Sequence, residues 1–323
     1  DAGFTIFYMG INIGAFSATL LCGWLGEVYG WSWGFGAAGI GMLLGLIVFQ
    51  WGQQYLMGHG EPAEPKQLKH SVGLPGLTVE RSIYLGSLLM VAVVWQLVQL
   101  TATVGTLLDV LSLTVLAGLG WFLVFRCNKV ERERMFVLIM LTLSTVIFWA
   151  LFEQGAGSMT LYADRVTDKT LFGVSLTAAQ FGAANSFFIF SLAPLFAMLW
   201  IRLGQRGWEP STPVKFSLGI AQAGLGFGAL VYGAQFPDQA GVVSAWWLIV
   251  AYLLHTTGEL CLSPVGLSAV TKLAVPSVVG VMMGTWFLAS AYSSYVAAQI
   301  ATIAARPSDE STLDLSGALT GYT

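Results

Sequence analysis

The sequence predicts an all-α, polytopic membrane protein, and three observations support this prediction. Of its 323 residues, 56% are hydrophobic and only 10% are charged, whereas soluble domains carry about 25% charged residues. Apolar runs of about 20 residues recur along the chain, and each is long enough to cross a bilayer as a helix. Glycine (38) and tryptophan (12) are plentiful, as in membrane helices that pack closely and end at interfaces.

About nine spans are expected, separated by short polar turns. The residues from 23 to 30 are expected to form a turn that holds Glu27. The longest polar segment, 58–81, contains several prolines and is expected to be an extramembrane linker. A charged loop should follow residue 154, and the end of the chain from 306 should be a polar tail. The expected spans are 4–25, 31–57, 83–104, 107–125, 135–154, 178–202, 216–234, 243–272 and 279–304.

The basic residues give this arrangement an orientation, because cytoplasmic loops of membrane proteins are enriched in Lys and Arg. If the loops alternate, eleven of the 14 basic residues fall on one side and only Arg165, Lys169 and Arg306 fall on the other. The first residue is then expected in the cytoplasm and the last outside. The eleven are Lys66, Lys69, Arg81, Arg126, Lys129, Arg132, Arg134, Arg202, Arg206, Lys215 and Lys272.

Glu153 is the first candidate functional residue. It lies at the end of the 135–154 run, with no basic residue between Arg134 and Arg165. A carboxylate in a membrane helix costs roughly 2.5–3.5 kcal/mol on insertion scales and is by default a functional candidate. Trp149 and Phe152 share its helical face. Glu153 is therefore expected either to exchange protons from a water-filled cavity or to be a structural ion pair or helix-end residue.

Glu259 repeats the situation near the end of the chain. His255 precedes it by four residues and Ser263 follows it by four, so the three side chains share one helical face. Pro264 should kink or break this helix and free backbone carbonyls to line a cavity. His255 has the chemistry of a proton relay, although a hydrogen-bonded core histidine is the alternative.

Two amides and two aromatic residues complete the candidates. Asn12 and Asn185 lie inside apolar spans, where an amide either binds a ligand or bonds across helices for structural reasons. Trp286 and Phe287 lie near the middle of a span. Tryptophan is more usual at span ends, so lining of a cavity and exposure to lipid are both open for this pair.

Several function classes find no support in the sequence. No Gly-rich phosphate loop, Cys/His cluster or Ser/His/Asp arrangement can be assembled, so neither an enzyme nor a bound metal or cofactor is predicted. The three cysteines stand alone and are expected to be packing residues. No basic patch interleaved with aromatic residues is present, so nucleic acid is not an expected partner.

The chain resembles a known family, the proton-coupled oligopeptide transporters (POT/PTR) of the major facilitator superfamily. Among these it resembles the bacterial type with two inserted helices. The resemblance covers nearly the whole chain. It rests on FYMGINIG at 7–14, FWALFEQ at 148–154, Asn185, GELCLSPVG at 258–266 and MMGTWF at 282–287, in that order.

The resemblance implies roles for the candidates. Glu153 and Glu259 would couple transport to protons, and Glu259 would face the amino terminus of a bound peptide. Asn12 and Asn185 would hold the peptide's backbone and ends. The other residues implied in the pocket and its gate are Trp149, Phe152, Ser263, Trp286 and Phe287.

The resemblance also implies a major facilitator fold that is incomplete, with family spans five to eleven plus the two inserted helices. Residues 1–57 would be the last two helices of the N-terminal bundle, 58–81 a cytoplasmic linker, 82–126 the inserted hairpin and 127–323 the C-terminal bundle without its last span. The acidic-basic motif of the family's first span, its fourth-span lysine and its second-span tyrosine have no counterpart, so the beginning is expected to be missing.

The function that the resemblance implies is proton-coupled import of di- and tripeptides by alternating access, in a monomer of the bacterial inner membrane. Another major facilitator carrier, for nitrate or a sugar, is the alternative. A non-transporting scaffold or receptor is a further one, although it would have no need of two acids in a cavity.

Overall fold

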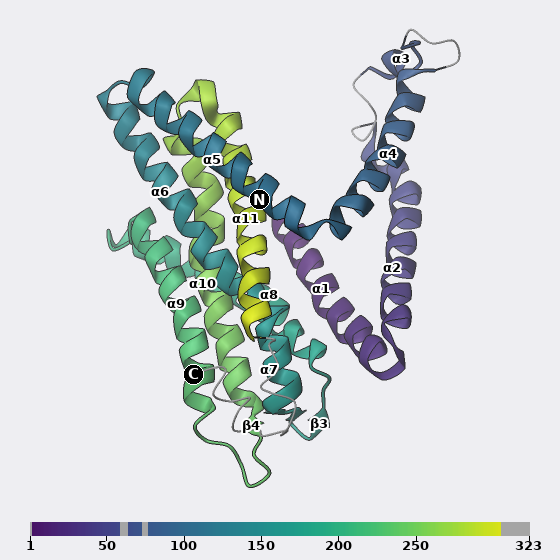
Figure 1. Ribbon diagram of the computed structural model, residues 1–323, viewed down its shortest axis with the longest axis vertical. Helices are drawn as coiled ribbons and strands as arrows, with labels where there is room; N and C mark the ends of the chain where they lie inside the picture. Colours follow the sequence, from purple (N-terminus) through teal and green to yellow (C-terminus); the bar gives the residue numbers. More distant parts are fainter. Residues whose placement is uncertain (1, 59–63, 73–76, 305–323) are drawn as a thin grey trace. The chain divides into compact units, whose positions relative to one another are not determined.

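The computed structural model describes residues 2–58, 64–72 and 77–304. The described chain is almost entirely helical and divides into two compact units, 1–35 with 112–323 and 36–111. Figure 1 shows the elements in chain order. The all-α prediction is therefore confirmed.

The first unit holds most of the helices. They are α1 (Ala2–Tyr29), the start of α2 (Trp31–Gly52), the end of α5 (Thr101–Phe125), α6 (Lys129–Phe152), η2 (Glu153–Gly155), α7 (Ser158–Val166), η3 (Ala179–Gly182), α8 (Ala183–Gln205), α9 (Thr212–Gly233), α10 (Ala245–Leu273), η4 (Pro276–Val278) and α11 (Val279–Ala304). Two small sheets accompany them. β1 (Thr167–Asp168) pairs in parallel with β4 (Val243–Ser244), and β2 (Thr170–Leu171) is antiparallel to β3 (Val174–Ser175).

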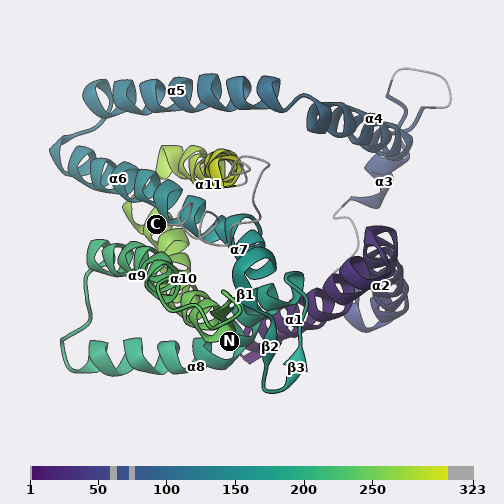
Figure 2. The same ribbon diagram turned by 60° about the horizontal axis from the view of Figure 1, so that its bottom comes forward.

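In this unit α10 is the central helix. It packs against α9, α8 and α6, and α11 packs against α6, as Figures 1 and 2 show. One core cluster forms around Phe148, Phe216 and Trp286, and a second around Tyr162 and Leu248. The two clusters hold the helices that surround the candidate site.

The second unit consists of the rest of α2, η1 (Gln53–Leu56), α3 (Pro65–Leu68), α4 (Val79–Gln99) and the start of α5. Its described side chains are nearly all exposed, as expected for helices that face lipid. Leu100 alone separates α4 from α5, so the turn comes a few residues before the expected position at 105–106.

Eight helical segments among the described residues are long and apolar enough to cross a membrane. The sequence predicted about nine spans. The ninth, residues 279–304, forms helix α11 at the expected place, but it is not among those eight. The expected tail from 306 lies outside the described residues.

Two boundaries differ from the prediction because glycine and charge were given too much weight. The expected turn at 23–30 is helical through Tyr29, and only Gly30, with φ +106°, leaves the helix. Gly23 instead allows close packing, since a Cβ there would lie 3.1 Å from the Cβ of Ala179. Helix α6 begins at Lys129, six residues early, because Asn128 and Glu131 form a capping box.

One further expectation was wrong and another was wrong in part, because both underestimated how far the helices extend. The loop expected after residue 154 contains helix α7, which buries Met159 and Tyr162 in the second core cluster. Pro264 does not break α10, which continues to Leu273. Neighbouring helices can compensate for a proline in a membrane helix, and α10 packs against three of them.

Candidate functional site

A cavity of about 410 Å³ lies within the first unit, where α1, α6, η2, η3, α8 and α10 approach one another. Aromatic, amide and carboxylate side chains line it together, which is the usual character of a small-molecule site. The lining residues are Thr19, Trp31, Phe152, Glu153, Gly155, Ala156, Thr160, Ala179, Gly182, Asn185, Tyr252 and His255.

Glu153 reaches this cavity because the helix breaks beside it. Helix α6 ends at Phe152, Glu153 begins the short 3₁₀ segment η2, and the chain turns at Gly157 into α7. The Glu153 side chain is exposed and lines the cavity. Among the described residues it forms no ion pair, so the structural-pair alternative finds no partner there.

Gln154 holds the break in place and was not among the predicted residues. Its side chain is 1% exposed, and its Nε2 donates to the carbonyls of Ala150 at 3.1 Å and Ala297 at 2.9 Å. Its Oε1 accepts from the Ser158 hydroxyl at 2.9 Å. One amide thus joins α6, α7 and α11. An amide at the end of an apolar span was the available signal, the same signal that singled out Asn185.

Asn185 connects the cavity to Glu259. Its Nδ2 donates to Thr256 Oγ1 at 3.0 Å and lies 3.4 Å from Glu259 Oε2. The Thr256 hydroxyl donates to the Tyr252 carbonyl at 2.7 Å, which leaves its oxygen free to accept from Asn185. Glu259 is half-buried and, in the described part of the chain, forms no ion pair. Asn185 therefore lines the cavity and contacts the half-buried acid at the same time.

Of the two aromatic residues predicted to form a wall beside Glu153, one lines the cavity. Phe152 lines the cavity and stacks on Phe148 at 5.7 Å between ring centroids. Trp149 meets both rings edge-on and packs on the first core cluster rather than lining the cavity. Its Nε1 is buried and has no hydrogen-bond partner among the described residues.

The other four predicted residues do not line this cavity. Asn12 is buried on α1, and Ser263 is half-buried on α10. Trp286 is buried in the first core cluster, edge-on to Phe216. Phe287, by contrast, is 63% exposed. Neither Trp286 nor Phe287 therefore shares the cavity lining with Glu153.

Two further residues of α10 line the cavity. The Tyr252 hydroxyl donates to the Gly155 carbonyl at 3.1 Å, which ties α10 to η2. His255 is 1% exposed, and its Nε2 lies 3.1 Å from the Ala223 carbonyl of α9. The core-histidine alternative describes this second contact.

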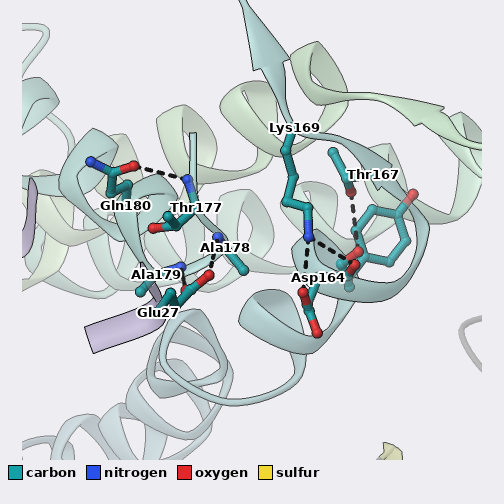
Figure 3. Close-up of polar contacts among 9 residues, drawn as sticks. Glu27, Asp164, Thr167, Lys169, Thr177, Ala178, Ala179 and Gln180 are labelled. Carbon is teal, nitrogen blue, oxygen red and sulfur yellow. Dashed lines mark hydrogen bonds and ion pairs between the residues drawn. The ribbon is translucent and has the colours of Figure 1, made fainter. Parts of the chain in front are cut away.

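Glu27 fastens α1 to the start of η3, through the bonds drawn in Figure 3. Its two carboxylate oxygens accept from the backbone N–H groups of Ala178, at 3.1 Å, and Ala179, at 2.6 Å. The Gln180 amide donates to the Leu20 carbonyl of α1 at 3.1 Å. Charge-assisted bonds of this kind are stronger than neutral ones. They hold α1 against η3, which supplies part of the cavity wall.

Away from the cavity, an ion pair links α9 to the segment that connects α8 with α9. Lys215 is buried, its Nζ lies 2.5 Å from Glu209 Oε1, and it also lies 4.5 Å from the centre of the Trp200 ring. The hydrogen bond from Lys215, and then its charge, lower the pKa of the Glu209 carboxyl.

Comparison with known proteins places these features in context. The PTR2 model, described as the POT family, matches residues 1–316. Uncharacterized transporter YclF of Bacillus subtilis is 39% identical over 93% of this chain and 60% of its own length. Peptide transporter YePEPT of Yersinia enterocolitica is 35% identical over 93% of this chain and 61% of its own.

A solved structure is similar along the whole chain. The crystal structure of a mutant of peptide transporter POT in complex with alafosfalin matches with a TM-score of 0.76 and 34% identity, over 100% of this chain and 65% of that one. The chain thus spans about 60% of the length of the curated relatives that it matches.

Proposed function

Because the chain belongs to the POT family, we propose that it forms part of a proton-coupled symporter that imports di- and tripeptides by alternating access. One observation carries the proposal: Glu153 lines the same cavity as Asn185, and Asn185 contacts Glu259. The name of YePEPT, a peptide transporter, supports the substrate class.

Glu153 and Glu259 are the proposed proton-coupling groups. A carboxyl group in a cavity that water reaches can take up and release a proton, and its charge then changes the contacts it makes. When Glu259 takes up a proton, its contact with the Asn185 amide weakens, because a neutral carboxyl attracts the N–H less strongly. A change of protonation on α10 thereby changes a contact that α10 makes with α8.

The peptide is proposed to bind beside these acids. Asn185 offers amide hydrogen bonds and Phe152 provides apolar surface. Trp149, which lies edge-on to Phe152 but outside the cavity lining, is proposed as a further part of the binding surface. In the proposed arrangement 127–323 is the C-terminal bundle, 1–57 belongs to the N-terminal bundle, and 58–81 and 82–126 are the cytoplasmic linker and the inserted hairpin. Asn12, Ser263, Trp286 and Phe287 complete the proposed binding surface from the parts of the two bundles that the cavity does not include.

The cellular setting follows the same family assignment. A monomer in the bacterial inner membrane is proposed, with the first residue in the cytoplasm because eleven of the 14 basic residues then lie inside.

Uptake into liposomes tests the coupling. The purified full chain is reconstituted, and labelled dipeptide uptake is measured with an inward proton gradient. We expect Glu153→Gln to lose gradient-driven accumulation while keeping counterflow exchange of labelled for unlabelled dipeptide, because exchange needs binding but no net proton movement.

Glu133→Gln is the matched control, since Glu133 lies exposed on the same helix, α6, about 30 Å along its axis from Glu153. It should behave as wild type. Full accumulation by Glu153→Gln would defeat the proposed role, and counterflow of nitrate or a sugar in place of dipeptide would favour another carrier function.

A further inference from the structure

His255 has one ring nitrogen whose role the fold explains and one whose role it does not. Nε2 lies 3.1 Å from the Ala223 carbonyl. A carbonyl oxygen only accepts hydrogen bonds, so Nε2 carries the proton in this contact. In the neutral ring, Nδ1 is then left with a lone pair and acts as an acceptor.

That acceptor is unsatisfied. The ring is 1% exposed, and Nδ1 is buried with no hydrogen-bond partner among the described residues. Buried polar side-chain atoms in folded proteins nearly always have a partner from the protein, from water or from a ligand. No described residue supplies a partner for Nδ1, so water, a ligand or a residue outside the described ranges is expected to provide one.

The geometry of the ring indicates where the partner lies. Its Nε2–Cδ2 edge faces α9: a Cβ added at Gly226 would lie 2.7 Å from Nε2. Nδ1 is on the opposite edge and so faces away from α9. His255 also lines the 410 Å³ cavity. Nδ1 itself has almost no exposed surface, so a partner in the cavity reaches it only when the side chains around the ring move apart.

The surroundings select the kind of partner. Phe152 and Phe227 flank the His255 ring, with centroids 6.3 Å and 5.0 Å away. Neither side chain can donate a hydrogen bond to Nδ1. Glu153 lines the same cavity with a second acceptor group. A ligand with N–H donors can bond to both Nδ1 and the Glu153 carboxylate, whereas an anion would be repelled by the lone pair and the carboxylate.

We propose that Nδ1 of His255 accepts a hydrogen bond from a backbone N–H of the peptide in this cavity. The inference rests on the proposed peptide substrate and adds a binding residue to it. His255 then has two separate tasks: Nε2 fastens α10 to α9, and Nδ1 binds a backbone N–H of the peptide. Every peptide has such a group, whatever its side chains.

Two substitutions separate these tasks. In His255→Gln, the amide nitrogen reaches the position of Nε2, so the bond to Ala223 can be kept while the acceptor at Nδ1 is lost. In His255→Asn, the amide oxygen takes the position of Nδ1, so the acceptor is kept while the bond to Ala223 is lost. A purely structural histidine predicts that Gln is the better replacement for every property measured.

The ligand is varied at the same time. Trialanine is compared with two analogues in which one or the other backbone N–H is replaced by an ester oxygen, and affinities are measured by competition for labelled trialanine binding to the purified full chain. We expect wild type to bind one analogue more weakly than the parent, and this preference to shrink about 2- to 10-fold in His255→Gln. His255→Asn should keep the preference.

The outcomes are separable from those of the proposed function. An ester penalty that is the same in wild type and His255→Gln would overturn the inference, because a water molecule would then be the partner of Nδ1. Peptide binding that shows the expected pattern without gradient-driven uptake would overturn symport and leave the inference standing. Absence of any peptide binding to wild type would overturn both.

Discussion

Gln154→Leu should destabilise the chain although it changes neither charge nor size greatly. The amide forms three hydrogen bonds, to Ala150, Ala297 and Ser158, and the side chain is 1% exposed. Each bond contributes about 0.6 kcal/mol by the average measured in a membrane protein and up to about 1.5 kcal/mol in soluble ones. The expected loss in unfolding free energy is therefore about 2 to 4.5 kcal/mol.

Thermal unfolding in detergent, followed by tryptophan fluorescence, measures this loss. Unfolding entropy near 2.1 cal/mol/K per residue amounts to about 0.7 kcal/mol/K for 323 residues. The midpoint Tm should then fall by roughly 3 to 6 °C.

Gln222→Leu is the matched control for this prediction. Among the described residues, Gln222 bonds only the Leu218 carbonyl of its own helix, at 3.2 Å, and the Cys261 thiol, at 3.6 Å. Its removal should lower Tm by about 1 °C or less. If the two leucine variants unfolded at the same temperature, the three-helix contact of Gln154 would have no energetic weight, and the argument about the break would be wrong.

Three further predictions concern contacts around the cavity and beyond it. Gly226→Ala should lower Tm because the new methyl group overlaps the His255 ring. In the background of His255→Ala the same change should cost less, since only the 3.2 Å approach to the Ala251 carbonyl oxygen then remains. Lys215 lowers the pKa of Glu209, so their pair stabilises the fold at pH values above the ordinary pKa near 4.5, and stabilises it less as the pH falls below that value. The Tm difference between wild type and Glu209→Gln should therefore shrink from pH 7 to pH 3. A constant difference would contradict this. Glu27→Ala should speed hydrogen exchange at the two backbone amides that it binds at the start of η3, more than Glu27→Gln does, and unchanged exchange would show that those amides have other acceptors.

Hydropathy was sufficient to predict the helices, because a membrane span must satisfy its backbone internally and therefore shows as a long apolar run. Boundaries were harder, since glycine has two opposite uses. Gly30 does end a helix with a positive φ, whereas Gly23 and Gly26 lie inside α1, where a side chain would strike Ala179 or the ring of Trp31. Which use applies depends on the neighbouring element, and sequence spacing does not name that neighbour.

The site shows the same limit. Glu153, Asn185 and Glu259 could be singled out because polar groups are costly in apolar spans. Their arrangement could not: Asn185 and Glu259 are 74 residues apart, and only packing of α8 on α10 brings them to 3.4 Å. Residue type alone also did not distinguish Phe152, which lines the cavity, from the exposed Phe287.

Glu153 and Gln154 show how one break in a helix can serve both stability and function. The two side chains are nearly the same size and adjacent, yet the acid is exposed to the cavity and the amide is buried among α6, α7 and α11. Successive residues of an α-helix differ by about 100° in direction, so adjacent side chains can lie on a packed face and on an open one. Here the 3₁₀ segment and Gly157 interrupt the helix, and the amide satisfies backbone groups at the interruption. The hydrogen bonds of Gln154 thus offset the cost of the break beside Glu153, and loosening Gln154 should weaken the proposed Glu153-dependent coupling before it abolishes folding.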